Sequence, residues 1–237
     1  MFSLNALRAF NWDPSVFLHF GRDDPVGLRY ARQHLGTVKE TAALGHDGKY
    51  FFVQAHDPFL LEGKLVAKYL DPPAYRAQRM LYPLLAAPAL LGGEWALAWA
   101  LIVVNLAAIG LGTWATSRLA LRMGASPWWG LAFALNPGVL FEVFIDGSGA
   151  LAWALGLVGL ASLQEGRPRS ARLALAAAAL ARETMLIVAV GAALWEWHRR
   201  RPGWWRLVTA PMASVAVWGL YVRWRLALPP WTYGGQG

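Results

Sequence analysis

Long apolar runs fill the second part of the chain and predict membrane-spanning helices. The clearest run, 95–115, contains no charged residue. At ~1.5 Å per helical residue it is long enough to cross a hydrocarbon core about 30 Å thick. Further apolar segments follow at about 127–145, 147–164, 171–195 and 204–222. Since spanning helices satisfy their own backbone hydrogen bonds in lipid, the pattern predicts an all-α, polytopic helical integral membrane protein.

The apolar segment 171–195 is interrupted by the adjacent charges Arg182 and Glu183. Each part, 171–181 and 184–195, is long enough for only about 17 Å of helix, which is too short to span a membrane. We therefore expect a helical hairpin with Arg182 and Glu183 at its buried tip, and one long span is the alternative. Charges within a membrane are costly, so a functional or paired role is the default for both residues.

Polar residues gather before the apolar runs. Residues 22–79 hold nine Lys or Arg and seven Asp or Glu. The chain is therefore expected to consist of a polar region with short helices, 1–79, followed by a transmembrane domain, 80–237, with about four to six membrane segments.

Composition agrees with a membrane protein, because 57% of the residues are hydrophobic, only 15% are charged and 14 are Trp. The chain has no cysteine, which excludes disulfides, a thiol nucleophile and a Cys-ligated metal. The net charge of +8 is compatible with nucleic-acid binding, but the basic residues flank the apolar runs. A membrane-orientation signal explains them better, so membrane lipids are expected partners and nucleic acid is not.

Three Arg-rich loops set the expected orientation, since positively charged loops favour the cytoplasmic side. This orientation leaves 1–79 outside the cytoplasm, although nothing in 1–13 resembles a signal peptide. We therefore expect a further apolar helix upstream of Met1 and a longer natural chain; the alternative is a cytoplasmic polar region and the reverse orientation. The Arg-rich loops lie at 118–122, 167–172 and 198–206.

Asp47 is the best candidate for a catalytic base. It is flanked by Gly45 and Gly48, which allow close approach of backbone and substrate. A carboxylate suits removal of a proton from an attacking hydroxyl group. The alternative is an ordinary turn, because His-Asp-Gly is also favourable turn chemistry.

Arg76 and Arg79 are three residues apart, so on a helix they share one face. Pro83 favours a helix start nearby, which places both arginines where a lipid phosphate would lie. The alternative is that both anchor the membrane interface by snorkelling. We expect Asp47, Arg76, Arg79 and Arg182 to converge on one outward-facing polar cleft.

Other ionisable residues give weaker signals. His46 and His56 are compatible with a divalent metal, but their ten-residue spacing is more typical of solvated loop histidines. Asp57 either contacts substrate or only shapes a loop. Glu142 and Asp146 are four residues apart and form either an acidic pair or, as we prefer, a helix cap at Asp146.

Three short motifs resemble bacterial members of the GT-C glycosyltransferase superfamily, in particular multi-spanning proteins of cell-surface glycopolymer formation. They lie at 45–50, 75–83 and 179–184, and the similar pattern covers roughly 15–225. The resemblance implies transfer of a sugar from a polyprenyl-phosphate donor to a glycan acceptor, at the outer face of a bacterial plasma membrane. Asp47 is assigned as the catalytic residue; no metal ligand and no certain cofactor are assigned. Substrate binding is assigned to His46, Lys49, Asp57, Arg76, Arg79, Tyr82, Arg182 and Glu183.

Two other classes of protein were compared with this interpretation. An intramembrane serine protease of the rhomboid type is excluded. Its Gly-x-Ser-Gly motif around Ser148 would need glycine at position 146, which is Asp, and no histidine lies in an apolar span to serve as the base. A non-catalytic scaffold or a transporter of lipid-linked glycan intermediates is the alternative. A transporter would be expected to show broken helices in repeated halves, whereas the chain has one such break and no internal repeat.

Overall fold

The computed structural model describes residues 8, 11–41, 43–63 and 67–227. These residues are helical wherever they are regular, and their only β-type pairings are two isolated bridges. The all-α prediction is therefore confirmed for the described residues. The chain divides into two compact units, one formed by 1–105, 141–147 and 222–237, the other by 106–140 and 148–221. The expected division between 79 and 80 stays a prediction.

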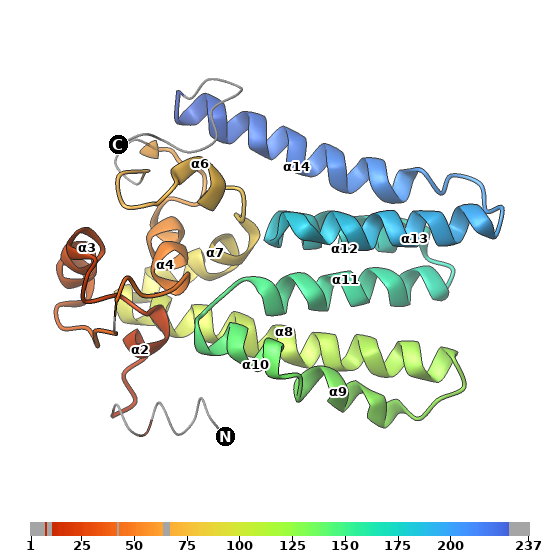
Figure 1. Cartoon of the computed structure of the whole chain (residues 1–237), viewed down its shortest axis with the longest axis horizontal. Helices are drawn as coiled ribbons and strands as arrows, with labels where there is room; N and C mark the ends of the chain where they lie inside the picture. Colours follow the sequence, from red (N-terminus) through yellow and green to blue (C-terminus); the bar gives the residue numbers. More distant parts are fainter. Residues whose placement is uncertain (1–7, 9–10, 42, 64–66, 228–237) are drawn as a thin grey trace. The chain divides into compact units, whose positions relative to one another are not determined.

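The first unit is built from short helices (Figure 1). They surround buried aromatic side chains. Phe17, Phe20, Phe52 and Tyr82 are almost fully buried and form much of its core. The helices of this unit are α2 (Ser15–Leu18), α3 (Pro25–Leu35), α4 (Gly48–His56), α6 (Pro73–Arg76), α7 (Leu81–Ala86) and the first turns of α8 (Glu94–Arg122).

A close backbone approach fixes the start of α4. The Gly48 N–H donates to the Ile145 carbonyl at 3.1 Å. A Cβ added at Gly48 would stand 2.7 Å from the Phe17 carbonyl oxygen and 2.9 Å from that of Ile145. Only glycine fits without a backbone shift. The expected close approach of backbone at Gly48 is confirmed, and the approach of a substrate stays a prediction.

The second unit contains the longer helices (Figure 1). Helices α11 and α12 pack against each other, and Leu175 of α12 fits against Gly159 of α11, where a Cβ would stand 2.8 Å from the Leu175 Cγ. The helices of this unit are the remainder of α8, α9 (Leu131–Ala134), most of α10 (Pro137–Phe144), α11 (Gly149–Gln164), α12 (Pro168–Ala181), α13 (Leu186–His198) and most of α14 (Arg206–Arg225).

The helical hairpin expected over 171–195 is confirmed. Helix α12 ends at Ala181, and Arg182 has an extended backbone with φ −158° and ψ 120°. Leu175 then shares one buried cluster with Ala189 and Ala192 of α13, a contact that a continuous helix does not permit. Arg182 and Glu183 are half-buried at the tip.

Among the described residues, only α8, with 29 residues, is both long and apolar enough to cross a membrane. The expectation of a single helix over 127–145 is wrong, because α9 ends at Ala134 and α10 begins at Pro137. Proline lacks an N–H and disfavours helical backbone in the preceding residue. Asn136 accepts from the Gly138 N–H at 2.8 Å and so caps α10. The 16 residues of α11 are shorter than a typical span.

Candidate functional site

Two arginines converge on the carboxylate of Asp47, which immediately precedes α4. Arg76 Nη1 lies 2.6 Å from Asp47 Oδ1, and Arg79 Nη1 lies 3.5 Å from Asp47 Oδ2. The exposed fraction of the side chain is 31% for Asp47, 20% for Arg76 and 6% for Arg79. The carboxylate of Asp47 and the guanidinium of Arg76 are therefore accessible, while the guanidinium of Arg79 is buried.

The two arginines do not lie on one helix, so that part of the prediction is wrong. Arg76 is the last residue of α6, and Arg79 follows in the turn before α7. This turn bends the chain enough to bring both side chains to the same carboxylate. Arg76 is also held by its Nε–H, which donates to the Asp71 carbonyl at 2.8 Å.

Tyrosine rings surround the charged groups. The guanidinium of Arg76 lies 4.2 Å from the centre of the Tyr50 ring, and that of Arg79 lies 4.6 Å from the Tyr75 ring. Arg79 Nη2 also donates to the Tyr75 hydroxyl. Stacking of this kind fixes the plane of a guanidinium and leaves its N–H groups directed along that plane.

These side chains can bind an anion and accept a proton. Arg76 uses its Nε–H and one Nη1–H in the bonds described, which leaves its other Nη N–H groups for a phosphate oxygen. Arg79 Nη1 lies at the long distance of 3.5 Å from Asp47 Oδ2, so this oxygen can accept from a hydroxyl group.

A buried polar network lies directly beyond Gly48. Tyr82, Asn105 and Asp146 have no exposed surface. The Tyr82 hydroxyl bonds to Asp146 Oδ1, and Asn105 Nδ2 donates to that hydroxyl at 2.8 Å and to Asp146 Oδ1 at 3.3 Å. Burial raises the pKa of Asp146 to about 7, against the opposing effect of the hydrogen bonds from Tyr82 and Asn105. The carboxyl group therefore titrates near neutral pH.

Asp146 does not cap α11, and the preferred interpretation from sequence is therefore wrong. The residue that precedes α11 is Ser148, and no side chain caps the helix there. Asp146 lies in the turn between α10 and α11 with a left-handed φ of 52°. This turn directs its carboxyl group to Tyr82 and Asn105.

Other predicted site residues have local partners. Lys49 is 4% exposed and its Nζ lies 2.5 Å from Asp24 Oδ2. Asp57 accepts from two backbone N–H groups, of Leu61 and Glu62, each at 2.7 Å, which confirms that it shapes a loop. His46 is exposed.

Tyr82 has no exposed surface, so contact with a substrate would require a rearrangement. Asp47, Arg76 and Arg79 lie together as predicted, and the outward-facing cleft around them stays a prediction. Arg182 belongs to the second unit, so its position beside the other three stays a prediction, as does substrate binding by Glu183.

A second ionisable cluster in the first unit was missed from the sequence. It joins His34 of α3, His56 at the end of α4 and Glu94 at the start of α8. His34 and Glu94 are 60 positions apart. No periodicity or spacing rule connects residues so distant, and only the packing of α3, α4 and α8 reveals the group.

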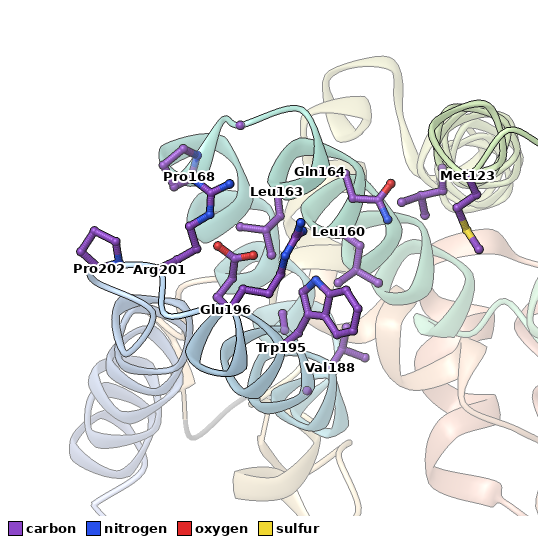
Figure 2. A pocket seen from close by; sticks show the side chains of 15 residues that line it. Met123, Leu160, Leu163, Gln164, Pro168, Val188, Trp195, Glu196, Arg201 and Pro202 are labelled. Atoms are coloured by element: carbon purple, nitrogen blue, oxygen red, sulfur yellow. The ribbon is translucent and has the colours of Figure 1, made fainter.

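A pocket of about 770 Å³, open to the surface, lies in the second unit. Leu160 of α11 and Val188 and Trp195 of α13 line it, together with Glu196 and Arg201 (Figure 2). None of the predicted site residues lines this pocket. Its lining combines apolar side chains with a few charged ones and gives no arrangement of acid, base or nucleophile.

No protein-family model, curated protein or solved structure matches this chain. The resemblance to GT-C glycosyltransferases therefore depends on the short motifs of the sequence. The geometry around Asp47 is the independent basis for a function.

Proposed function

We propose that this protein is a polytopic membrane glycosyltransferase of the GT-C type. It transfers a sugar from a polyprenyl-phosphate donor to a cell-surface glycan or glycopolymer acceptor, at the outer face of a bacterial plasma membrane. The observation that supports this most is the Asp47 carboxylate, held by Arg76 and Arg79 beside tyrosine rings. One accessible carboxylate and an adjacent cationic pair are what glycosyl transfer from a phosphate requires.

The donor phosphate competes with Asp47 for the arginines. Without the donor, the single carboxylate pairs with both Arg76 and Arg79 and leaves one net positive charge. A bound phosphate takes over part of these contacts through the fork of Arg76 and leaves an oxygen of Asp47 to the acceptor. Binding of the donor thereby makes Asp47 available as the base for the acceptor hydroxyl.

Transfer then forms a bond from the acceptor oxygen to the anomeric carbon and breaks the bond from that carbon to the phosphate oxygen. The acceptor proton passes to Asp47. The electron pair of the broken bond stays on the phosphate, and the guanidinium groups of Arg76 and Arg79 stabilise the added negative charge. Stabilisation that grows as charge develops lowers the barrier for the chemical step.

The membrane part of the proposal combines the one long apolar helix with the shorter ones. Helix α8 meets the length of a full span. In the proposed arrangement α11, the hairpin of α12 and α13, and α14 are also membrane segments. The Arg-rich loops then face the cytoplasm, and the polar region that carries Asp47 faces outward.

The test is transfer of labelled sugar from polyprenyl phosphate in membranes, at matched expression. Arg76→Lys keeps the charge but loses the fork, so the KM for the donor should rise while the protein still folds. Asp47→Asn should lower kcat instead, because the substitution removes the base but keeps the size of the side chain.

Matched control variants come from exposed positions. Asp23→Asn and Arg169→Lys make the same chemical changes at exposed sites, and both should retain wild-type transfer. Wild-type rates in Asp47→Asn would remove Asp47 from the proposed role. A full-length protein that turns over no lipid-linked sugar would favour a scaffold or transporter.

A further inference from the structure

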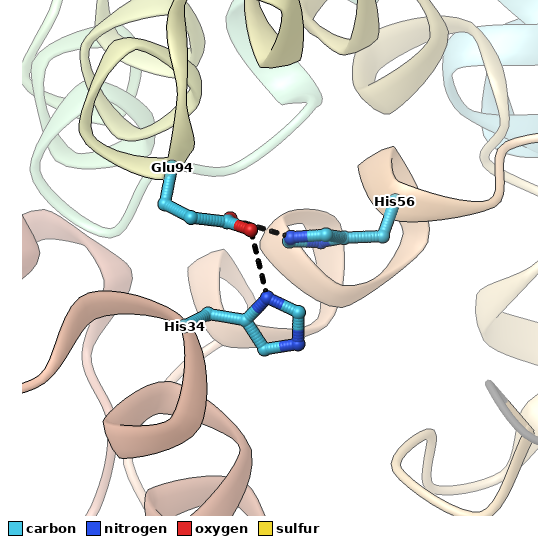
Figure 3. A group of neighbouring side chains, drawn as sticks. All are labelled: His34, His56 and Glu94. Atoms are coloured by element: carbon cyan, nitrogen blue, oxygen red, sulfur yellow. Dashed lines mark hydrogen bonds and ion pairs between the residues drawn. The ribbon is translucent and has the colours of Figure 1, made fainter.

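Two histidines and one carboxylate from three helices meet in the first unit (Figure 3). His34 Nδ1 lies 2.8 Å from Glu94 Oε1, and His56 Nε2 lies 2.7 Å from Glu94 Oε2. One ligand atom from each residue lies within 4.8 Å of the others. The side chains are half-buried, with exposed fractions between 13% and 30%. The three residues therefore surround one small volume that solvent still reaches.

The hydrogen-bond partners of His56 show why this cluster suits a cation. The other ring nitrogen of His56, Nδ1, lies 2.8 Å from the Phe52 carbonyl, which only accepts. Glu94 also only accepts when it is ionised. Both ring nitrogens of His56 thus face oxygen atoms that act as acceptors in this arrangement. A metal ion at Nε2 takes the place of one hydrogen and leaves Nδ1–H to the carbonyl.

The Phe52 carbonyl fixes the tautomer that a metal ligand needs. Histidine ligands commonly donate their second N–H to a carbonyl or carboxylate, and this bond orients the ring toward the metal. The Tyr30 ring packs against both histidines, with centroids 4.3 Å from His34 and 5.5 Å from His56. The ring orientations are therefore held from outside the cluster.

We propose that His34, His56 and Glu94 form a zinc site. Two imidazoles and one carboxylate are a ligand set that zinc uses when a fourth position stays open for water or a substrate oxygen. Zinc–ligand bonds of about 2.0–2.1 Å require ligand atoms to approach to about 3.3 Å in a tetrahedron. Zinc binding therefore requires the widest separation, which is at most 4.8 Å, to contract and the His–Glu distances of 2.7 and 2.8 Å to lengthen. Rotation about the side-chain bonds of Glu94 and His34 is the change that the proposal requires.

The zinc site is separate from the Asp47 site. Asp47 precedes α4 and His56 is the last residue of that helix. His56 is nine positions after Asp47, which corresponds to about 13 Å along the helix. A zinc ion at His56 therefore does not touch the Asp47 carboxylate, and it joins α3, α4 and α8 at one point. Its open position is directed to water or to an anionic oxygen.

The test measures zinc bound to the whole chain, purified in detergent without a histidine tag and stripped of metal. Titration of ZnCl₂ by calorimetry should give one zinc per chain, and the midpoint of thermal unfolding should rise with zinc concentration. His34→Gln and Glu94→Gln should weaken zinc binding by more than about 100-fold, since even changes beyond the direct ligands cost 10–100-fold. His198→Gln, an exposed histidine outside the cluster, should bind zinc as the wild type does.

The number of imidazole ligands around the bound zinc distinguishes this site from adventitious binding. This measurement uses the wild type and does not depend on folding of the variants. X-ray absorption of the zinc-loaded wild type should show two imidazole ligands, with oxygen in the remaining positions. A wild-type protein that binds no zinc, a different imidazole count, or unchanged affinity in folded His34→Gln would each overturn the proposal. None of these results affects the role of Asp47, because the transfer assay examines a different site.

Discussion

Replacement of the buried carboxyl group at Asp146 should change how stability depends on pH. Burial raises its pKa from the 3.8 of an exposed carboxyl to about 7. At a pH between 3.8 and about 7, Asp146 is ionised in the unfolded chain but still protonated in the folded chain. Because the folded-state pKa is the higher one, the stabilising contribution is complete below pH 3.8 and is lost as the pH rises through about 7.

The size of this effect follows from the same two values. At about 1.36 kcal/mol per pH unit, the gap corresponds to about 4 kcal/mol of stability that is lost between pH 4 and pH 7. Asp146→Asn cannot ionise, so this loss should disappear. Its amide oxygen can still accept from Tyr82 and Asn105 at the position of Oδ1. The amide N–H groups replace Oδ2, which has no hydrogen-bond partner among the residues that the structure describes, at a cost of about 1–3 kcal/mol.

The assay is equilibrium unfolding in mixed micelles, followed by circular dichroism at pH 4, 5, 6, 7 and 8. The free energy of unfolding should fall with pH more steeply in the wild type than in Asp146→Asn, and the two curves should run parallel above about pH 8. Asp23→Asn, at an exposed position, should leave the wild-type pH dependence in place. Equal pH dependence of wild type and Asp146→Asn would refute a raised pKa at Asp146.

Two further substitutions test the local structure by thermal unfolding. Gly48→Ala should destabilise the protein by about 1–3 kcal/mol, because its Cβ would stand 2.7 Å from the Phe17 carbonyl oxygen. Gly110→Ala is the control, since nothing lies within 4 Å of the added Cβ, and it should be neutral or slightly stabilising. Asn136→Ala should cost about 0.5–2 kcal/mol through loss of the cap on α10, and an unchanged unfolding midpoint would contradict that role.

Features with strong local signals were predictable from the sequence. The uncharged run at 95–115 predicted a long helix, and α8 contains it. The charged break at Arg182 and Glu183 predicted a hairpin, because neither half was long enough to span a membrane. Asn136-Pro137 also carried a signal, since proline limits the backbone before it. We nevertheless expected one helix over 127–145, because the high apolar content of this segment outweighed the helix break that Asn136-Pro137 indicates.

Features that depend on tertiary packing were not predictable. Asp146 looked like a helix cap because its neighbours along the chain are small and polar. Its actual partners, Tyr82 and Asn105, lie 64 and 41 positions away. The convergence of Arg76 and Arg79 was expected on a helical face, whereas a turn between α6 and α7 produces it. The residue types therefore indicated the chemistry, and only the fold gave its geometry.

Sugar transfer by Asp47→Asn tests the proposed function most directly. Labelled polyprenyl-phosphate sugar, at a concentration that saturates the donor site, should be turned over about 10²–10⁴-fold more slowly by the variant than by the wild type. Donor binding should persist in the variant, because Arg76 and Arg79 are retained, while Asp23→Asn should transfer at the wild-type rate. Transfer by Asp47→Asn within a few-fold of the wild-type rate would contradict the assignment of Asp47 as the base.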